Sequence, residues 1–393
     1  MKNQRKQKPG ERRVNLFPLG SHHSFPRFSI IGAGNGGMAM AGHLALAGFP
    51  VKLFNRNPAK LAGVIHEGGI RLKGQIEGFA HIPKVTSDPR EAVADADVLM
   101  VVVPASGHRV IAKILAPYLK DGQIVVLNPG RTLGALEFEH IIVEAGCQAS
   151  VVVAEAQSLL YASRITNAAE VTIFGIKNTV PVAAIPAWQT ERVTKILNLA
   201  FPQFIQAAHV LQTSLDNVGA VLHPAPTILN MARIESGETF EYYHQGITPR
   251  IARIVEQLDQ ERLSIAKALG LETMSTKEWL EKAYGATGED LYEAILNNVG
   301  YSGILAPSSM PTRYITEDVP TGLVPLAALG ELTGVATPTI NSLINMASFA
   351  EGADYWTEGR SLQNLGLAGK GLEEIFAYIL EGREGLFPRV SNV

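Results

Sequence analysis

Cysteine is almost absent from this sequence: Cys147 is the only one in 393 residues. A single cysteine excludes an intramolecular disulfide and also a metal cluster held by several thiolates. This usage is typical of proteins in a reducing compartment, so we expect a cytoplasmic location.

Long apolar runs and a strong excess of one charge are also missing. The longest apolar run covers residues 98–105 and already contains Pro104, whereas crossing a bilayer takes roughly 20 residues. The net charge is −3, but residues 1–26 carry a net +5, which leaves −8 for residues 27–393. An acidic body of this kind predicts neither a membrane nor a nucleic-acid partner.

The remaining composition indicates a globular protein. Hydrophobic residues make up 46% and charged residues 18% of the chain, which is enough apolar content to bury a core and excludes a disordered or fibrous protein. The length predicts two or three domains. We expect a disordered basic extension over 1–26, to which we assign no function, followed by domains over 27–207 and 208–393.

A glycine-rich turn opens the first of these domains. Phe28–Ile31 has the pattern of a buried strand, the turn follows at once, an Ala/Leu-rich helix runs to Leu46, and Val51–Phe54 is a second strand. This context predicts a dinucleotide site, because the glycines allow a tight turn and a close approach of the backbone to a pyrophosphate. The helix N-terminus offers N–H groups to the phosphates. The candidate cofactor-binding residues are Gly32, Ala33, Gly34, Asn35, Gly36 and Gly37.

The end of the second strand bears on which dinucleotide binds. An NAD site usually has an acidic residue here for the ribose 2′-hydroxyl, but this strand ends in Asn55-Arg56-Asn57. Arg56 suits a 2′-phosphate through its fork of donors, while Asn55 also suits the NAD ribose. We therefore expect NADP or NAD, with a slight preference for NADP.

Further strands alternate with helices and predict an α/β fold, a doubly wound parallel sheet of Rossmann type. Strands are expected over 97–103, 123–127 and 150–154, with segments 171–176 and 203–207 completing the sheet. Ligands of such sheets bind at the carboxyl ends of the strands. Glu155 and Gln157 are candidates to border the substrate there, and we expect His108 to lie on a helix surface.

From about residue 208 the strand patterns stop and apolar residues follow helical spacing, which predicts an all-helical second domain. Two segments of this region are candidates for chemistry. His223 precedes Pro224, which biases the histidine out of helical geometry and suits the first turn of a following helix. Arg313 and Asp318 lie in a short stretch that otherwise reads as a surface loop with salt bridges. Taken alone, these features favour a capping or structural histidine at position 223 over a catalytic one.

These elements together resemble the opine dehydrogenase family of the octopine/nopaline dehydrogenase type, which includes N-(1-carboxyethyl)-norvaline dehydrogenase. The resemblance covers about residues 27–385. It rests on the glycine turn, the stretch 217–230 around His223-Pro224, the segment 313–320, and the segment 359–367. It implies a Rossmann domain followed by a helical domain, with the site in the cleft between them.

The resemblance also implies an activity: condensation of an amino acid amine with a 2-oxo acid such as pyruvate, and reduction of the imine by NADH or NADPH. His223 would be the general acid/base, Asp318 its partner, and Arg313 the residue that binds the oxo-acid carboxylate. Histidine titrates near neutral pH, and a guanidinium matches a carboxylate in a bidentate fashion. The expected partners are thus a small-molecule amino acid and a 2-oxo acid, without a metal. The amino acid and the physiological direction stay open, and a homodimer is compatible with the sequence.

Two alternatives come from the same features. Ketopantoate reductase and glycerol-3-phosphate dehydrogenase pair a similar Rossmann pattern with a helical domain but rely on a lysine, and Lys267 is the only lysine in residues 208–270. A dinucleotide-sensing protein without catalysis would bind cofactor only. The presence of both His223 and Asp318 favours the opine reaction over each of them.

Overall fold

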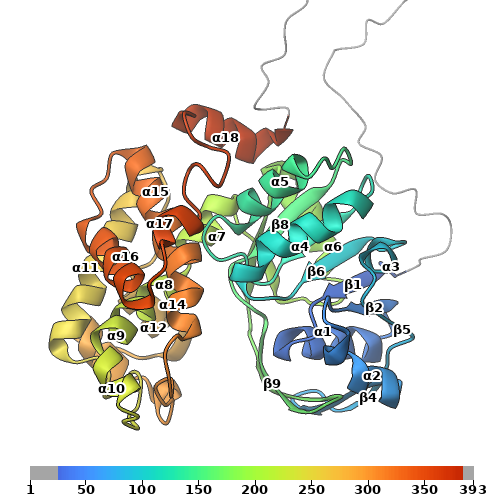
Figure 1. The fold of residues 1–393 in the computed structure, drawn as a ribbon, viewed down its shortest axis with the longest axis horizontal. Coiled ribbons are helices and arrows are strands. Elements are labelled where there is room, and N and C mark those ends of the chain that lie inside the picture. Colours follow the sequence, from blue (N-terminus) through green and yellow to red (C-terminus); the bar gives the residue numbers. More distant parts are fainter. Residues whose placement is uncertain (1–24, 384–393) are drawn as a thin grey trace, which may run out of the picture.

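The computed structural model describes residues 25–383, so the predicted extension over 1–26 lies almost entirely outside the described residues. Two parts stand side by side: an α/β part formed by the first half of the chain and a helical part formed by the second (Figure 1). This arrangement confirms the predicted fold class.

An eight-stranded sheet forms the centre of the α/β part, in the order β12-β11-β8-β7-β6-β1-β2-β5. Every pairing is parallel except that of β11 with β8. The strands are β1 (Phe28–Ile31), β2 (Val51–Phe54), β5 (Lys84–Thr86), β6 (Val98–Val101), β7 (Ile124–Leu127), β8 (Val152–Ala156), β11 (Val180–Ile185) and β12 (Phe204–Gln206). The helices are α1 (Asn35–Leu46), α2 (Ala62–Glu67), α3 (Pro89–Val93), α4 (His108–Leu115), α5 (Gly134–Glu144) and α6 (Thr190–Leu197).

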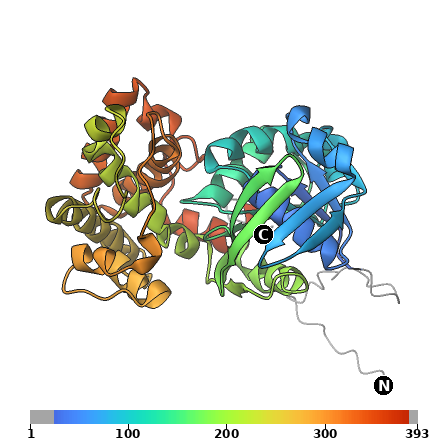
Figure 2. The same ribbon diagram turned by 90° about the horizontal axis from the view of Figure 1, so that it is seen from below.

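A second, four-stranded sheet corrects one prediction. Its order is β4-β3-β10-β9, with β3 (Gly69–Gly74), β4 (Gly78–His81), β9 (Tyr161–Asn167) and β10 (Glu170–Ile176). The segment 171–176 therefore does not complete the main sheet, while 203–207 does, as β12. Figure 2 shows this sheet as green strands beside blue ones. The physical reason is visible in β10, where only Val171 and Ile173 are buried: alternation marks a strand with one covered face, unlike the fully buried β6.

Helix α1 is enclosed between the two sheets, since it contacts β1 and β2 on one side and β3, β4, β9 and β10 on the other. Such a position leaves room only for small side chains. A Cβ on Gly42, for instance, would lie 2.8 Å from Leu72 Cδ2. The Gly/Ala-rich sequence after the turn thus follows from packing as well as from cofactor binding.

The second half of the described chain is helical, apart from an isolated bridge between Glu241 and Leu305. Its helices are α7 (Val210–Leu215), α8 (Val218–Leu222), α9 (Pro224–Leu229), α10 (Met231–Glu235), α11 (Pro249–Ala268), α12 (Thr276–Tyr284), α13 (Leu291–Leu296), α14 (Arg313–Thr316), α15 (Val324–Thr333), α16 (Pro338–Glu351), α17 (Tyr355–Glu358) and α18 (Leu372–Glu381), and the π-helical turn η6 (Val319–Leu323) precedes α15.

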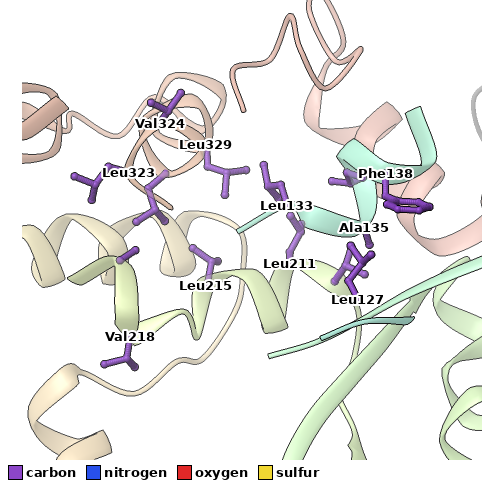
Figure 3. Close-up of a cluster of buried hydrophobic side chains, with 14 of the residues drawn as sticks. Leu127, Leu133, Ala135, Phe138, Leu211, Leu215, Val218, Leu323, Val324 and Leu329 are labelled. Carbon is purple, nitrogen blue, oxygen red and sulfur yellow. The ribbon is translucent and has the colours of Figure 1, made fainter. Parts of the chain in front are cut away.

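One apolar core continues from the α/β part into the helical part. Leu127 of β7 and Phe138 of α5 belong to the same buried cluster as Leu211 of α7 and Leu323 of η6 (Figure 3). A shared apolar core favours a defined relative placement of the two parts, because separating them would expose this surface to water.

The chain crosses between the two parts twice. It enters the helical part through α7 and leaves it after α17. Helix α18 then packs on β11 and on the short helix η4 (Ala187–Gln189) of the α/β part. Arg383, just after α18, lies 3.4 Å from a carboxylate oxygen of Glu139 on α5. Within the described residues, no helix has both the length and the apolar character needed to cross a bilayer.

Candidate active site between the two parts

The glycine turn leads from β1 into α1. Gly32 has a φ of +123°, and a Cβ on it would lie 2.3 Å from the carbonyl oxygen of Val102. A Cβ on Gly37 would lie 1.8 Å from the carbonyl oxygen of Gly32. At Gly34, by contrast, no atom lies within 4 Å of such a Cβ. This open space at the N-terminus of α1 fits a pyrophosphate, so these residues suit a nicotinamide dinucleotide, which supplies hydride transfer when bound.

Neighbouring elements hold this turn in place. Ala33 is buried. The Asn35 side-chain oxygen accepts a hydrogen bond from the backbone N–H of Ile165 at 2.9 Å. A Cβ on Gly36 would lie 2.8 Å from Leu159 Cδ2. The loop after β8 and the strand β9 therefore border the turn. No local sequence pattern predicts these contacts.

At the end of β2, Asn55 and Arg56 lie where the sequence analysis placed them. The Asn55 side-chain oxygen accepts a hydrogen bond from the backbone N–H of Asn57 at 2.9 Å, which shapes the turn. Arg56 is exposed. Because the side chain is already in solvent, its guanidinium can reach an anionic group beyond the end of the strand.

His223 and Asp318 are brought together from positions 95 residues apart. His223 Nδ1 lies 2.8 Å from Asp318 Oδ2. Asp318 is fully buried, whereas the His223 side chain keeps 15% of its surface exposed. The Tyr314 ring stacks on the imidazole, with centroids 4.2 Å apart. A carboxylate at Nδ1 leaves Nε2 as the ring nitrogen that can exchange a proton with a bound molecule.

The backbone of His223 is also fixed. Its carbonyl oxygen accepts hydrogen bonds from the Tyr242 hydroxyl at 2.6 Å and the Thr227 hydroxyl at 2.8 Å. His223 joins α8 to α9 with φ −103° and ψ −51°, so the expectation that Pro224 drives it out of helical geometry is wrong. The preference before proline is a bias, and here the tertiary contacts outweigh it. Pro224 does lie in the first turn of α9.

Arg131, which the sequence analysis missed, contacts both acids of the 313–320 segment. Its Nη1 lies 3.4 Å from Asp318 Oδ1 and its Nε lies 3.5 Å from Glu317 Oε1. Nη1 also donates to the Asn217 side-chain oxygen at 3.3 Å. Arg131 follows β7 with a φ of +61°. The only signal for it in the sequence is its place after a strand end, the edge at which ligands of such sheets bind.

These contacts set the charges of the site. Burial opposes ionisation of Asp318, but the positive charges of Arg131 and His223 outweigh it and lower its pKa below the usual range. Burial likewise opposes the charge on Arg131, yet the Asp318 and Glu317 carboxylates raise its pKa. Asp318 is therefore an anion at neutral pH and can support a positive charge on the imidazole.

Arg313 lies on α14, at the edge of this cluster. Its side chain is 60% exposed, and Nη1 lies 3.5 Å from Glu317 Oε2. Arg313 thus contacts Glu317, the residue before Asp318, rather than His223 or Asp318 itself. An exposed guanidinium with a single long ion pair can turn toward a ligand at little cost.

Glu155 in β8 and Gln157, just after the strand, differ in their surroundings. Glu155 is completely buried and accepts hydrogen bonds from the Thr213 hydroxyl at 2.6 Å and the backbone N–H of Ala135 at 2.7 Å. The expectation that it borders the substrate is therefore wrong; it joins α5 to α7, and burial raises its pKa. Gln157 is half-buried and donates to the carbonyl oxygen of Asp216 at 2.7 Å.

His108 is likewise buried and not on a helix surface, contrary to expectation. Arg360, from the segment after α17, lies 3.0 Å from His108 Nδ1 and donates to Glu137 Oε2 at 2.9 Å. It also donates to the carbonyl oxygens of Gly130 and Thr132 at 2.9 and 2.7 Å, on either side of Arg131. A buried cation from a distant segment requires partners, and His108 is one of them.

Between residues 25 and 383, no group of three or more histidine, cysteine or acidic side chains is arranged to hold a metal ion.

Comparison with known proteins agrees with this geometry. Residues 206–350 match the α-helical domain of NAD/NADP octopine/nopaline dehydrogenase, and residues 27–130 match the NAD binding domain of 6-phosphogluconate dehydrogenase. The chain is 42% identical to an opine dehydrogenase of Arthrobacter sp. (strain 1C) over 347 residues, which cover 87% of this chain and 95% of that protein. This chain belongs to the opine dehydrogenase family.

More distant relatives extend the comparison. Protein ocs of Agrobacterium tumefaciens (strain Ach5) is 29% identical over 89% of this chain and 98% of its own length. A structure of octopine dehydrogenase with NADH and L-arginine shares the fold at 22% identity, with a TM-score of 0.77 over 91% of this chain and 98% of that one. Membership of the opine dehydrogenase family makes the chain an NAD(P)-dependent oxidoreductase. Lys267, which a lysine-based mechanism would need, lies exposed on α11.

Proposed function

We propose that this opine dehydrogenase joins the amine of an amino acid to pyruvate or a similar 2-oxo acid and reduces the resulting imine with NADPH or NADH. The observation that carries the proposal is the His223–Asp318 contact of 2.8 Å, next to Arg131 and Arg313. Octopine dehydrogenase structures contain NADH with L-arginine or with pyruvate, which supports these substrate classes. Residues 27–207 serve as the cofactor domain and residues 208–393 as the substrate domain.

In this proposal, His223 moves the protons of the condensation. Nε2 takes a proton from the attacking ammonium group and passes it to the carbonyl oxygen. It then takes a second proton from the carbinolamine nitrogen and passes it to the same oxygen, which leaves as water. Asp318 holds Nδ1–H and stabilises the imidazolium between these steps. Tyr314 and the two hydroxyls on the His223 carbonyl oxygen keep the ring in one orientation.

Arg313 binds the oxo-acid carboxylate in this proposal. A carboxylate can replace the 3.5 Å contact with Glu317 and gain two parallel hydrogen bonds from the guanidinium. Arg131, which is 12% exposed, keeps Asp318 ionised. The two arginines thus have separate tasks.

Amine-dependent oxidation of NADPH and NADH tests this function. The assay combines pyruvate with a panel of amino acids and compares the wild type with His223→Ala. Oxidation that needs both substrates and falls at least 100-fold in the variant supports the proposal. Oxidation with the oxo acid alone would instead identify a simple ketone reductase, and cofactor binding without turnover would point to a sensor.

For the cofactor we propose a preference for NADPH, supported by exposed Arg56 and by the absence of a carboxylate in residues 55–57. Arg56→Ala should raise the KM for NADPH about tenfold and leave the KM for NADH unchanged. Equal effects on both cofactors would contradict the preference.

We also propose a cytoplasmic location, supported by the single free and buried cysteine. Fractionation of cells that produce the tagged protein tests this, and recovery in a membrane or secreted fraction would contradict it. Analytical ultracentrifugation of the same preparation tests for a homodimer.

A further inference from the structure

Lys177 is a cation at the carboxyl edge of the sheet, and among the described residues it has no acidic partner. It follows β10 in the short loop that leads to β11. Its Nζ donates to the Ser158 hydroxyl at 2.7 Å, and its backbone N–H donates to the carbonyl oxygen of Leu160 at 3.0 Å. Throughout residues 25–383, no carboxylate forms an ion pair with Lys177.

The loop that carries Ser158 connects the cofactor site with the helical part. On one side, Leu159 lies against the glycine turn, where a Cβ on Gly36 would meet it at 2.8 Å. On the other side, Gln157 donates to the carbonyl oxygen of Asp216 at the end of α7. Ser158 lies between these two contacts in the chain, so the Lys177 ammonium group is held by a loop that borders both the turn and the helical part.

The positive charge of Arg131 also acts on this ammonium group. The Lys177 residue as a whole is exposed, but desolvation of its ammonium group and, secondarily, the positive charge of Arg131 lower its pKa to about 8. Arg131 lies 3.4 Å from Asp318. The cation that lies beside Asp318 thus also acts on Lys177, although the sequence neighbours of Lys177 form a loop of ordinary composition.

The charges of the site leave one of the two substrate carboxylates without an assigned cation. Asp318 and Glu317 are balanced by Arg131 and Arg313. The product of the proposed reaction carries two carboxylates, and Arg313 is assigned to one of them. Lys177 supplies a positive charge that no carboxylate of residues 25–383 pairs with, and a carboxylate ligand would stabilise that charge.

We propose that Lys177, with the Ser158 hydroxyl, binds the second substrate carboxylate, the one that Arg313 does not bind. Ser158 accepts from Lys177 and keeps its own O–H to donate to the same carboxylate. The proposal rests on the proposed function. Lys177 would then act in substrate binding and not in proton transfer.

Steady-state kinetics of Lys177→Met and Lys177→Arg test this role. We expect Lys177→Met to raise the KM of one of the two substrates by about 10- to 100-fold, which corresponds to a lost charged hydrogen bond, and to change kcat by less than about threefold. Lys177→Arg should restore most of the affinity. Lys195→Met is the matched control, because Lys195 is an exposed lysine on α6 that pairs with Glu191.

Substrates without a carboxylate identify which one is bound. If the KM rises for the amino acid but not for the amine that lacks its carboxylate, Lys177 holds the amino acid carboxylate. If the KM rises for the oxo acid with either amine, Lys177 holds the oxo-acid carboxylate and Arg313 holds the other. Unchanged KM values for both substrates, or a rise confined to NADPH and NADH, would overturn the proposal. Wild-type turnover in the same assay shows separately whether the proposed function holds.

Discussion

The chemistry of the site depends on how few positions the His223 imidazole can take. Nδ1 is held by Asp318, one ring face by Tyr314, and the backbone carbonyl by Tyr242 and Thr227. Buried polar groups that are satisfied in this way fix one orientation. The tautomer with a proton on Nδ1 and a free Nε2 follows from the carboxylate.

Replacing the carboxylate should therefore remove catalysis and keep binding. We predict that Asp318→Asn lowers kcat by about 10²- to 10⁴-fold, because an amide neither fixes the tautomer nor supports the imidazolium. The KM for NADPH should stay within about threefold of the wild type. Steady-state kinetics and cofactor fluorescence measure the two effects, and a loss of cofactor binding would show that Asp318 is mainly structural.

A second residue-scale prediction concerns Glu139, whose pKa burial raises to about 7 against the opposing charge of Arg383. Between pH 4.5 and 7 the unfolded chain loses this proton while the folded chain keeps it, so the free energy of unfolding falls as pH rises through this window. The free energy of unfolding of Glu139→Gln should equal that of the wild type at pH 4. At pH 8 it should be about 3 kcal/mol higher than that of the wild type. Urea unfolding at the two pH values measures this; equal slopes with pH would contradict it.

Part of the candidate site could be predicted from the sequence at the scale of single residues. The family resemblance pointed to His223 and Asp318, and the structure brings them together. Arg131 and Lys177 could not be predicted in this way, because the role of each depends on side chains that other elements place beside it. The burial of His108 also depends on Arg360, 252 residues away. Contacts of that kind leave no local pattern.

Among the elements, the glycine turn shows why similar residues have different tasks. Gly37 lies too close to Gly32 for any side chain, while Gly34 faces open space with an ordinary φ of −89°. The strand and helix around the turn were predictable from hydrophobic patterning. The separate sheet that contains β10 was not, since pairing partners are a matter of topology.

The two glycines give a matched pair of variants. We predict that Gly34→Ala folds with a Tm within about 2 °C of the wild type but weakens NADPH binding at least tenfold, because its methyl group occupies the space that a pyrophosphate needs. Gly37→Ala should instead lower the Tm strongly or prevent folding, because its Cβ would lie 1.8 Å from the carbonyl oxygen of Gly32. Calorimetry and fluorescence titration separate the two. Tight NADPH binding by folded Gly34→Ala would count against the assigned site.

Across the whole molecule, Arg360 ties the segment after α17 to the α/β part. It is fully buried and bonds to Glu137, His108 and the carbonyl oxygens of Gly130 and Thr132. These carbonyls flank Arg131, so Arg360 also positions the cation beside Asp318.

We predict that Arg360→Met destabilises the protein by about 3–5 kcal/mol, the usual cost of leaving a buried partner unpaired. Arg109→Met is the control: Arg109 pairs with the same Glu137 carboxylate but is 36% exposed, and its loss should cost about 1 kcal/mol. Chemical denaturation of both variants gives the comparison. Similar losses for the two would show that burial of Arg360 contributes little.

The return of α18 to the α/β part limits how the molecule can move. A body tethered at one point can turn about three axes, whereas a body tethered at two separated points can turn only about the line that joins them. Here the tethers are the segment before α7 and the segment between α17 and α18. The two tethers thus restrict how the helical part can turn relative to the sheet, and the apolar core shared by the two parts restricts it further.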